Sequence, residues 1–573
     1  MKPEAKRLFW QLLKRYRRPA AVALGASTLL NVLLFAGSLY LLLVYDAVLP
    51  SRSVPTLFGL FGMLVVVYLF HALFDAIRSS AMLSIADGVH RDLAPRVHHA
   101  GSNRPLRAGR GEGDGVQIVR DLDNVHSFVA GNGPLALIDL PWVVVFLAVL
   151  TLLHVWLGVA ALFGVLVMAV IAIVSSIRTR DASHDLARTT AERSARLQAE
   201  LRLTEAAAAL GMRERMLARS AEMDDRYRTI QGGLAAVVGR FGGAGRVFRI
   251  FLQSLILTVG ALLVIDGEAT AGIIIAASVL SGRALAPVDQ AIGNWRGLVA
   301  ASSGWRRIVD ALIETPPPAP RQTTLEPPSQ AIVLNDVWVV PPGSQTPVVQ
   351  GVRLTVESGQ VLAVIGPSAA GKTSLIKALL GIWKPARGEI RLDGALHDHW
   401  DPEALGAAFG YVPQTVELVD GTIAENIARL DPDATSEGVI AAATKAGLHE
   451  TILALPDGYD TRVSGGGGEL SAGQRQRIGP ARALYGEPFL LVLDEANSNL
   501  DDAGDRALAE AVTGHRQRGG IVVMITHRPA TLGPATHIAL LTAGKLADYG
   551  PRDEVLKRVF KQVPDIRGRE AAA

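Results

Sequence analysis

Cysteine is absent from the 573-residue sequence, and charged residues make up only 19% of it. Without cysteine, the chain cannot form disulfides, thiolate metal sites or a cysteine nucleophile. The formal net charge of +3 is far smaller than that of typical nucleic-acid-binding proteins, so we expect no nucleic-acid partner. Soluble globular chains usually carry about 25% charged residues. With 49% hydrophobic residues and a mean hydropathy of +0.28, this sequence is typical of a membrane protein instead.

Uncharged runs long enough to cross a bilayer occur along the first half of the chain. Ala20–Tyr45 has 26 residues without a charge, and seven Lys or Arg precede it within the first 18 residues. A signal peptide would have a shorter apolar core and a small-residue cleavage site, so we expect an uncleaved first span. The further uncharged runs are Val54–Phe74, Leu140–Ile177, Ile250–Ile265 and Thr270–Gly282. The run that starts at Leu140 has 38 residues, enough for two spans with a turn near His154, which makes six spans in all.

Arginine is distributed unevenly among the segments that join these spans. Segment 78–134 has seven arginines and segment 178–249 has fourteen, whereas 46–53 has one and 266–269 has none. The positive-inside rule therefore predicts that both termini and both long loops are cytoplasmic. Leu, Ala and Met recur at helical spacing over 181–230, so we expect the membrane helices to continue into the cytoplasm.

The composition changes after the last span. Prolines cluster between Thr315 and Pro328, which is typical of a linker. Beyond it, β-branched runs such as Val361–Ile365 and Leu490–Leu493 alternate with amphipathic helical stretches, the pattern of an α/β domain with a buried sheet. The expected organisation is a basic N-terminal segment (1–19), a six-helix transmembrane domain (20–314), a linker (315–330) and an α/β domain (331–573).

A glycine-rich motif follows the run Val361–Ile365. Residues 366–373 fit G-x-x-x-x-G-K-[ST] between an apolar strand and a helical run, which is the context that a P-loop requires. Its glycines allow backbone N–H groups to surround phosphate oxygens at a helix N-terminus. Lys372 is expected to hold the β- and γ-phosphates of ATP, and the Thr373 hydroxyl a Mg²⁺. The expected nucleotide contacts of this loop are Gly366, Pro367, Ser368, Ala369, Ala370, Gly371, Lys372, Thr373 and Ser374.

Two carboxylates follow the apolar run Leu490–Leu493. Asp494 is placed to order the Mg²⁺ shell, and Glu495 to polarise an attacking water. If this pair stood alone, a strand that ends in a solvated Asp-Glu pair would be the better interpretation. The motifs on both sides of it favour the catalytic interpretation.

Leu470-Ser-Ala-Gly-Gln474 resembles the signature motif of ABC transporters. Together with the P-loop upstream and the acidic strand downstream, this motif identifies the family. The resemblance implies that Ser471, Gly473 and Gln474 face the γ-phosphate of an ATP bound by the opposite protomer. Two ATP molecules would then lie between the nucleotide-binding domains of a dimer.

The other family motifs follow in order. Gln414 in Tyr-Val-Pro-Gln matches the Q-loop, Asp501 in Asn-Ser-Asn-Leu-Asp matches the D-loop, and His527 in Ile-Thr-His matches the switch histidine. The resemblance implies a membrane α-helical bundle of ABC exporter type fused to an α/β P-loop nucleotide-binding domain. The implied catalytic residues are Glu495, His527 and Gln414, and the implied Mg²⁺ residues are Thr373, Gln414 and Asp494.

Three positions depart from the family pattern. The adenine-stacking aromatic should fall near Pro341, and the neighbouring Trp338 is out of register, so the contact with adenine is left open. Ala472 replaces a common glycine. Pro480 lies inside the expected signature helix, where it should kink the helix or cost about 3 kcal/mol.

Four segments of the membrane half resemble type I secretion permease/ATPases of the PrtD kind: Val44–Leu57, Asp139–Trp142, His154–Gly158 and Ala284–Arg296. The resemblance implies a homodimer in the bacterial inner membrane that hydrolyses ATP to export an unfolded polypeptide with a C-terminal signal, such as an RTX-type protease or lipase. A periplasmic adaptor and an outer-membrane channel would receive it. Export of a lipid or small amphiphile is the alternative with the same fold, and an ATP-binding channel or regulator without turnover is a third.

Two acidic residues and one loop carry further expectations. Asp46 and Asp139 lie near predicted span ends, where capping or snorkelling is as good an interpretation as substrate contact. Glu205–Met212, in the second long loop, is the candidate coupling element between the membrane bundle and the ATPase.

Overall fold

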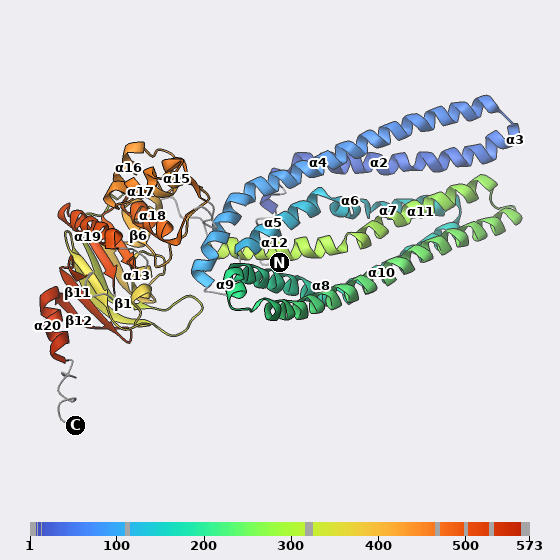
Figure 1. The fold of residues 1–573 in the computed structure, drawn as a ribbon. Coiled ribbons are helices and arrows are strands. Elements are labelled where there is room, and N and C mark those ends of the chain that lie inside the picture. Colours follow the sequence, from blue (N-terminus) through green and yellow to red (C-terminus); the bar gives the residue numbers. More distant parts are fainter. Residues whose placement is uncertain are drawn as a thin grey trace, which may run out of the picture. The chain divides into compact units, whose positions relative to one another are not determined.

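The computed structural model of the chain describes residues 7, 10–12, 14–108, 115–315, 325–463, 470–497, 502–526 and 532–562. It divides into two compact units, one made of Met1–Arg104 with Asp114–Pro317 and the other of Pro105–Gly113 with Pro318–Ala573. The first unit is helical and the second mixes helices with strands (Figure 1).

Long helices make up the first unit, because a helix satisfies all its backbone hydrogen bonds within the segment. They are α2 (Arg17–Leu43), the π-helical turn η1 (Val44–Val48), α3 (Leu49–Ser51), α4 (Val54–Ala108), α5 (Gly115–Ala130), α6 (Asn132–Asp139), α7 (Trp142–Leu153), α8 (Val155–Arg202), α9 (Thr204–Ala209), α10 (Arg213–Ile265), α11 (Ala271–Gly293) and α12 (Trp295–Glu314).

Six spans are present if one bent pair of helices counts as a single span. Among the described residues, five helices are long and apolar enough to cross a membrane, and the pair α6–α7 supplies the sixth with a bend of 42°. Pro141 lies at this bend, where it cannot donate a helical hydrogen bond. The uncharged run from Leu140 predicted the start of the third span there, whereas the structure extends this span back to Asn132. The turn predicted near His154 is confirmed, since this residue separates α7 from α8.

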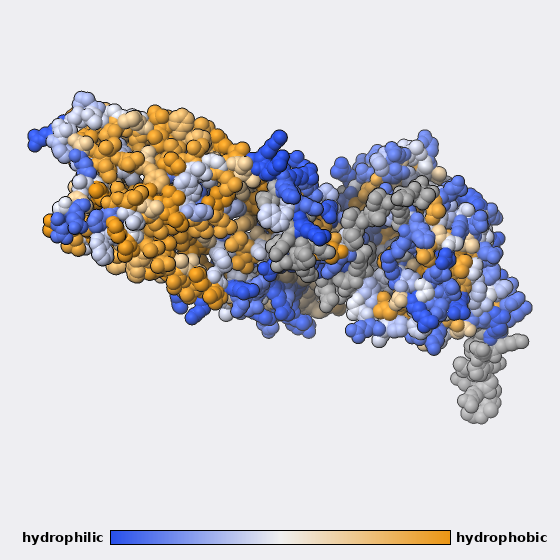
Figure 2. All heavy atoms as spheres, turned by 180° about the vertical axis from the view of Figure 1, so that it is seen from behind, coloured by the Kyte–Doolittle hydropathy of each residue, from blue (hydrophilic) through white to orange (hydrophobic). Residues whose placement is uncertain are grey.

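On the face that Figure 2 shows, apolar side chains form a belt over the middle of the helical unit, and hydrophilic ones gather at its two ends. Phe58, Leu69, Val144, Leu152 and Ile265 are each between 66% and 86% exposed. A surface in water rarely exposes so many large apolar side chains together. The belt is therefore the lipid-facing surface of a multi-pass membrane protein.

Three helices are far longer than a bilayer requires. α4, α8 and α10 have 55, 48 and 53 residues, whereas about 20 suffice to span the hydrocarbon core. Most of 181–230 is helical, so the prediction that the membrane helices continue beyond the bilayer is confirmed. The short helix α9 lies between α8 and α10 and overlaps the candidate coupling element Glu205–Met212, whose role stays a prediction (Figure 1).

The second unit is built on a six-stranded sheet in the order β12-β11-β3-β10-β9-β6, in which only β12 runs antiparallel to its neighbour. A four-stranded antiparallel sheet has the order β2-β1-β4-β5, and β7 pairs with β8. The strands are β1 (Ala331–Val339), β2 (Val349–Glu357), β3 (Val361–Ile365), β4 (Arg387–Leu392), β5 (Ala395–Leu396), β6 (Phe409–Val412), β7 (Gly421–Thr422), β8 (Arg462–Val463), β9 (Leu490–Asp494), β10 (Ile521–Ile525), β11 (His537–Thr542) and β12 (Lys545–Pro551).

The helices of this unit surround the sheets. They are α13 (Lys372–Leu379), η2 (His397–His399), α14 (Pro402–Ala407), α15 (Ile423–Ile427), α16 (Ser436–Lys445), α17 (His449–Leu453), η3 (Gly458–Asp460), α18 (Ala472–Leu484), α19 (Asp502–Gln517) and α20 (Arg552–Gln562). β9 and β10 are buried along their whole length, as their continuous apolar sequences predict. Carboxyl ends of parallel strands share one edge, so the segments after β3, β6 and β9 meet there.

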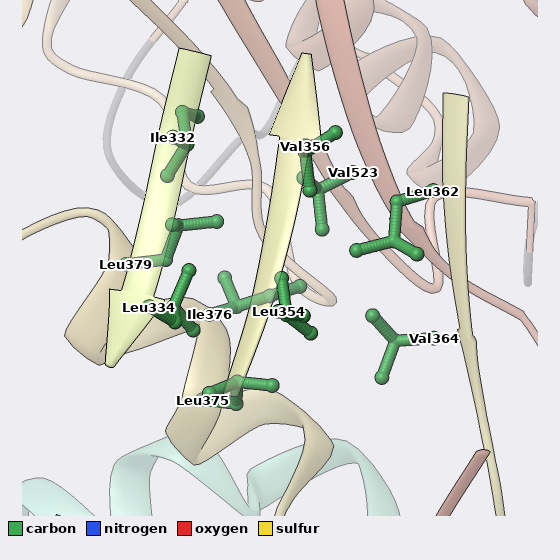
Figure 3. A pocket seen from close by; sticks show the side chains of 10 residues that line it. All are labelled: Ile332, Leu334, Leu354, Val356, Leu362, Val364, Leu375, Ile376, Leu379 and Val523. Atoms are coloured by element: carbon green, nitrogen blue, oxygen red, sulfur yellow. The ribbon is translucent and has the colours of Figure 1, made fainter. Parts of the chain in front are cut away.

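The helix after the P-loop, α13, rests on an apolar core (Figure 3). Aliphatic side chains of α13 and of β1, β2, β3 and β10 surround a cavity of only about 10 Å³, which has no polar partner for a water molecule. They are Ile332, Leu334, Leu354, Val356, Leu362, Val364, Leu375, Ile376, Leu379 and Val523. This packing holds α13, and hence the loop before it, against the sheet.

Truncating one of these side chains should therefore be costly. Leu375 is 4% exposed, and Leu375→Ala should lower the free energy of unfolding by about 2–5 kcal/mol, measured by denaturant unfolding of the full chain in detergent. Leu453 on α17 is 55% exposed and is the matched control, with an expected loss below about 0.5 kcal/mol. Equal losses in the two variants would contradict the packing argument.

Candidate functional site

The loop between β3 and α13 needs glycine at both of its ends. Gly366 has φ +150° and Gly371 has φ +93°. A Cβ at Gly366 would lie 2.1 Å from the Leu541 carbonyl oxygen, and one at Gly371 would lie 2.5 Å from that of Val348. Only glycine fits such close approaches. Residues 367–369 are exposed between these ends, so their backbone is open to a ligand.

Lys372 opens α13 and folds back over the loop. Its Nζ donates to the carbonyl oxygens of Gly366 and Pro367, each at 2.9 Å, and the residue is 6% exposed. Burial lowers the pKa of the Lys372 ammonium, while the charges of Glu495 and Asp494 oppose that shift. Phosphate oxygens would be stronger acceptors for this ammonium than the neutral carbonyls that it contacts here.

Thr373 and Asp494 come together from α13 and β9. The Thr373 hydroxyl donates to Asp494 Oδ1 at 3.2 Å, and Asp494 is 2% exposed. Burial raises the pKa of the Asp494 carboxyl, and the hydrogen bond from Thr373 opposes the shift. These hard oxygens fit Mg²⁺, which proteins commonly bind through one or two carboxylates plus substrate phosphates. Among the described residues no three His, Cys, Asp or Glu groups could hold a metal by themselves, so Mg²⁺ here would also need phosphate oxygens.

Glu495 follows β9 in a left-handed backbone conformation, with φ +52°. Such a conformation is uncommon for residues other than glycine. It interrupts the regular alternation of side chains between the two faces of the strand. Gln414, from the segment after β6, donates from Nε2 to Glu495 Oε2 at 3.1 Å. The structure thus brings two sequence-predicted catalytic side chains together at the sheet edge.

Tyr411 is a neighbour of the site that the sequence analysis did not single out. It lies on β6, and burial together with the charge of Asp494 raises the pKa of its phenol to about 12. The phenol is therefore neutral at physiological pH and adds no negative charge beside Asp494. The sequence could have indicated Tyr411 only through its position three residues before Gln414.

The predicted signature residues form the N-terminus of α18. Ser471 Oγ accepts the Gln474 backbone N–H at 3.2 Å, and Gln474 Oε1 accepts the Ser471 N–H at 2.8 Å. This reciprocal pair is a capping box, with Gly473 in the first turn. α18 is continuous through Pro480, so this proline does not end the helix.

Two of the predicted site residues, Asp501 and His527, fall outside the described residues. The Arg387 guanidinium lies 5.8 Å from the centre of the Trp338 ring, so this indole packs within its own sheet. Pro341 lies two residues after the end of β1.

Asp46 caps the N-terminus of α11. Its carboxylate accepts the Thr270 hydroxyl at 2.6 Å and the Gly272 backbone N–H at 2.9 Å. A carboxylate at a helix N-terminus satisfies free N–H groups and is attracted by the helix dipole. Of the two interpretations left open for Asp46, the structure favours capping.

Asp139 belongs to a polar network between the first three spans. It ends α6, and its carboxylate accepts Asn31 Nδ2 at 2.8 Å and Arg78 Nη1 at 3.0 Å. The Arg78 and Asp139 side chains are only 16% and 13% exposed. The ion pair joins α4 to the bend at Pro141.

Removing either partner of this pair leaves a largely buried charge with weaker compensation, because Arg78 then keeps the half-exposed Asp75 and Asp139 keeps the neutral Asn31. We expect Arg78→Gln and Asp139→Asn each to destabilise the chain by about 3–5 kcal/mol. The double variant should lose less than the sum of the two, by about 0.5–3 kcal/mol, in denaturant unfolding in detergent. The surface pair Arg188–Glu192 serves as the control, because exposed pairs contribute about 0–1 kcal/mol. Additive losses for Arg78 and Asp139 would show that they do not act as a pair.

Comparisons with known proteins match both units. The family model of the ABC transporter matches residues 349–498, and that of the ABC transporter transmembrane region matches residues 21–288. The chain is similar to the type I secretion system ATP-binding protein PrsD of Rhizobium meliloti (strain 1021), with 44% identity over 545 residues, 95% of this chain and 93% of that protein. It is also similar to the alpha-hemolysin translocation ATP-binding protein HlyB of Escherichia coli, with 28% identity over 553 residues, 95% of this chain and 77% of that protein.

A solved structure shows the same fold. The structure of a bacterial Atm1-family ABC exporter with ATP bound matches with a TM-score of 0.81 and 23% identity, over 95% of this chain and 96% of that one. The predicted fold class, a helical membrane bundle fused to an ABC nucleotide-binding domain, is confirmed. The resemblance to type I secretion permease/ATPases is confirmed by the identity to PrsD over nearly the whole of both chains. The chain therefore belongs to the type I secretion ATP-binding proteins of the ABC transporter family, and it is a multi-pass membrane ATPase coupled to export.

Proposed function

We propose that two copies of this chain form a homodimer that exports an unfolded polypeptide with a C-terminal signal, of the RTX-type protease or lipase class. The 44% identity to a type I secretion protein carries this proposal. The names of two more distant relatives refer to translocation of alpha-hemolysin and of leukotoxin.

The P-loop binds ATP in the proposed cycle. Residues 366–374 surround the phosphates with backbone N–H groups, and the Lys372 ammonium exchanges its loop carbonyls for β- and γ-phosphate oxygens. Mg²⁺, when bound, neutralises phosphate charge. Thr373, Asp494 and Gln414 would hold it, which the hydrogen bond between Thr373 and Asp494 supports.

Glu495 is the proposed general base. Its carboxylate accepts the proton of the water that attacks the γ-phosphorus, and Gln414 orients that carboxylate through the bond at Oε2. Ser471, Gly473 and Gln474 of one protomer would face the ATP of the other, because the N-terminus of α18 attracts anions. The family pattern adds Asp501 and His527 to this shared site.

The proposed location is the inner membrane, with both termini cytoplasmic. The excess of arginine in segments 78–134 and 178–249 supports this orientation. A periplasmic adaptor and an outer-membrane channel are the proposed partners, by the same family relationship.

Secretion of a candidate cargo by cells that contain a defined set of components tests the proposal. The chain is produced in bacteria together with a candidate cargo, adaptor and channel encoded beside its gene, and the cargo is measured in the medium. Full-length cargo should appear outside the cell, whereas cargo without its C-terminal segment, or cells with Glu495→Gln, should secrete none. Secretion that does not depend on the C-terminal segment would overturn the proposal. Stimulation of the ATPase by lipid, but not by a C-terminal signal peptide, would favour lipid or amphiphile export instead.

A further inference from the structure

Two half-buried arginines of the ATPase unit bind backbone carbonyls rather than carboxylates. They are Arg429, which follows α15, and Arg482, near the end of α18. Neither forms an ion pair with any residue that the structure describes. Burial lowers the pKa of both guanidinium groups. Carbonyl dipoles are thus the main compensation for two partly desolvated charges.

Arg482 joins α18 to the segment that follows β6. Its Nη1 donates to the Glu417 carbonyl oxygen at 2.9 Å, three residues after Gln414. Its Nε and Nη2 donate to the carbonyl and to Oδ1 of Asn426, at 3.0 Å and 2.7 Å. Asn426 in turn binds the N–H and the carbonyl of Val419, each at 2.9 Å. Residues 413–420, here named the Q segment, are therefore tied to the helix whose first residues form the signature motif.

Arg429 joins the same C-terminal end of α18 to the central sheet. Its Nε and Nη2 donate to the carbonyl oxygens of Arg482 and Ala483, at 2.8 Å and 2.9 Å. Its Nη1 donates to the carbonyl oxygen of Phe409, the first residue of β6, at 2.8 Å. The last carbonyls of a helix lack partners within the helix, so a guanidinium can bind them firmly. Arg429 thus makes the start of β6 and the end of α18 move together.

A close approach adds a direct contact between the same two elements. A Cβ at Gly479 of α18 would lie 2.6 Å from Cγ2 of Val416 in the Q segment. Val416 is 8% exposed, so its side chain has little room to move. Any displacement of the Q segment therefore presses on α18 at this position.

We propose that Arg429 and Arg482 are positioning residues that transmit the position of the Q segment to the signature helix α18. Gln414 reaches Glu495 in the nucleotide site of its own protomer, while the N-terminus of α18 serves the partner's site. The pair would therefore couple the two sites of a dimer. This inference rests on the proposed function for the shared ATP sites, but not on the identity of the cargo. Most hydrogen bonds of the two guanidinium groups are made to backbone carbonyl oxygens. A movement of the main chain of the Q segment would therefore be transmitted to the main chain of α18.

Lysine substitutions test the role of the two guanidinium forks. Lys keeps the charge but cannot reproduce a planar fork that binds several carbonyls at once. For Arg482→Lys and Arg429→Lys we expect kcat to fall about 10- to 100-fold, with the Kd for ATP and the Tm close to those of the unsubstituted chain. Arg353→Lys is the control, since Arg353 is an exposed residue of β2. If Kd and Tm worsen along with kcat, or if kcat changes no more than in Arg353→Lys, the proposal is overturned.

The absence of cysteine allows a direct measurement of the coupling. Ser436→Cys on α16 and Gln517→Cys on α19 are both exposed and can carry spin labels, in dimers with one labelled protomer. A non-hydrolysable ATP analogue should change the label distance in the otherwise unsubstituted chain, and Arg482→Lys should abolish that change while the analogue still binds. A change that persists in Arg482→Lys, or that never occurs, overturns the proposal. This result needs only nucleotide binding, so it can be read even if the cargo assignment fails.

A second variant tests the contact at Gly479 independently. Gly479→Ala should lower kcat by displacing Val416, although alanine is intrinsically better than glycine in a helix by about 1 kcal/mol. Adding Val416→Ala makes room for the new methyl group and should restore kcat. Failure of this rescue would contradict the contact as a route of transmission.

Discussion

Glu495→Gln should lower the kcat of ATP hydrolysis by about 10²- to 10⁴-fold while ATP still binds. The amide has nearly the same shape as the carboxylate, but it cannot accept a proton from the attacking water. Gln414 can still contact the side chain oxygen, so the site should keep its geometry. The measurements are phosphate release from the full chain in lipid vesicles and the Kd for ATP of the same preparation.

Glu487→Gln is a matched control for this substitution. Glu487 has φ +51°, close to the +52° of Glu495, but it pairs with Lys445 away from the site. We expect its phosphate release to be unchanged. If phosphate release is also unchanged in Glu495→Gln, the assignment of the base is wrong. An unsubstituted chain that binds ATP but releases no phosphate would instead support a regulator without turnover.

Lys372→Met should weaken ATP binding by about 100-fold, because charge-assisted hydrogen bonds contribute about 1.5–3 kcal/mol each. Methionine keeps much of the volume and the apolar stem but removes the ammonium that would reach the phosphates. The fold should tolerate the change, since burial already disfavours this charge and lowers its pKa. Titration with a fluorescent ATP analogue gives the Kd, and thermal unfolding checks the fold.

Lys384→Met is the control for the loss of one positive charge. Lys384 is exposed and pairs with Asp398 at the surface, so its Kd for ATP should stay within about twofold of the unsubstituted value. A Kd for Lys372→Met that matches this control would remove Lys372 from the phosphate site. A fall in Tm confined to Lys372→Met would show instead that the ammonium serves the loop itself.

Local sequence patterns predicted most of the architecture. Uncharged runs identified the membrane helices, and the turn at His154 followed from a run too long for one span. The start of the third span was misplaced, because α6 is short and ends in the charged Asp139, so that it forms a span only together with the following helix α7. The P-loop was readable because its glycines are required by close backbone approaches within a short segment.

Contacts between distant segments were beyond the reach of sequence patterns. Asp46 caps a helix whose first residues lie more than 220 positions further along the chain, and nothing near Asp46 in the sequence indicates that partner. Arg429 and Arg482 look like ordinary surface residues of amphipathic segments, yet they are half-buried and bind backbone carbonyls. Such carbonyls are present at every residue, so no residue type identifies them as partners.

Low charge and long apolar runs thus determined by themselves that this chain is a membrane protein, the absence of cysteine excluded disulfides and thiolate sites, and the ordered nucleotide motifs determined that the chain carries an ABC ATPase. These features depend on local composition and on spacings of a few residues, which the chain retains whatever its tertiary structure. Only the tertiary structure decided that Asp139 pairs with Arg78, that Trp338 packs on Arg387, and that the Q segment is tied to α18. The physical reason is that burial and hydrogen-bond partners arise from the packing of distant segments, which side-chain type alone does not specify.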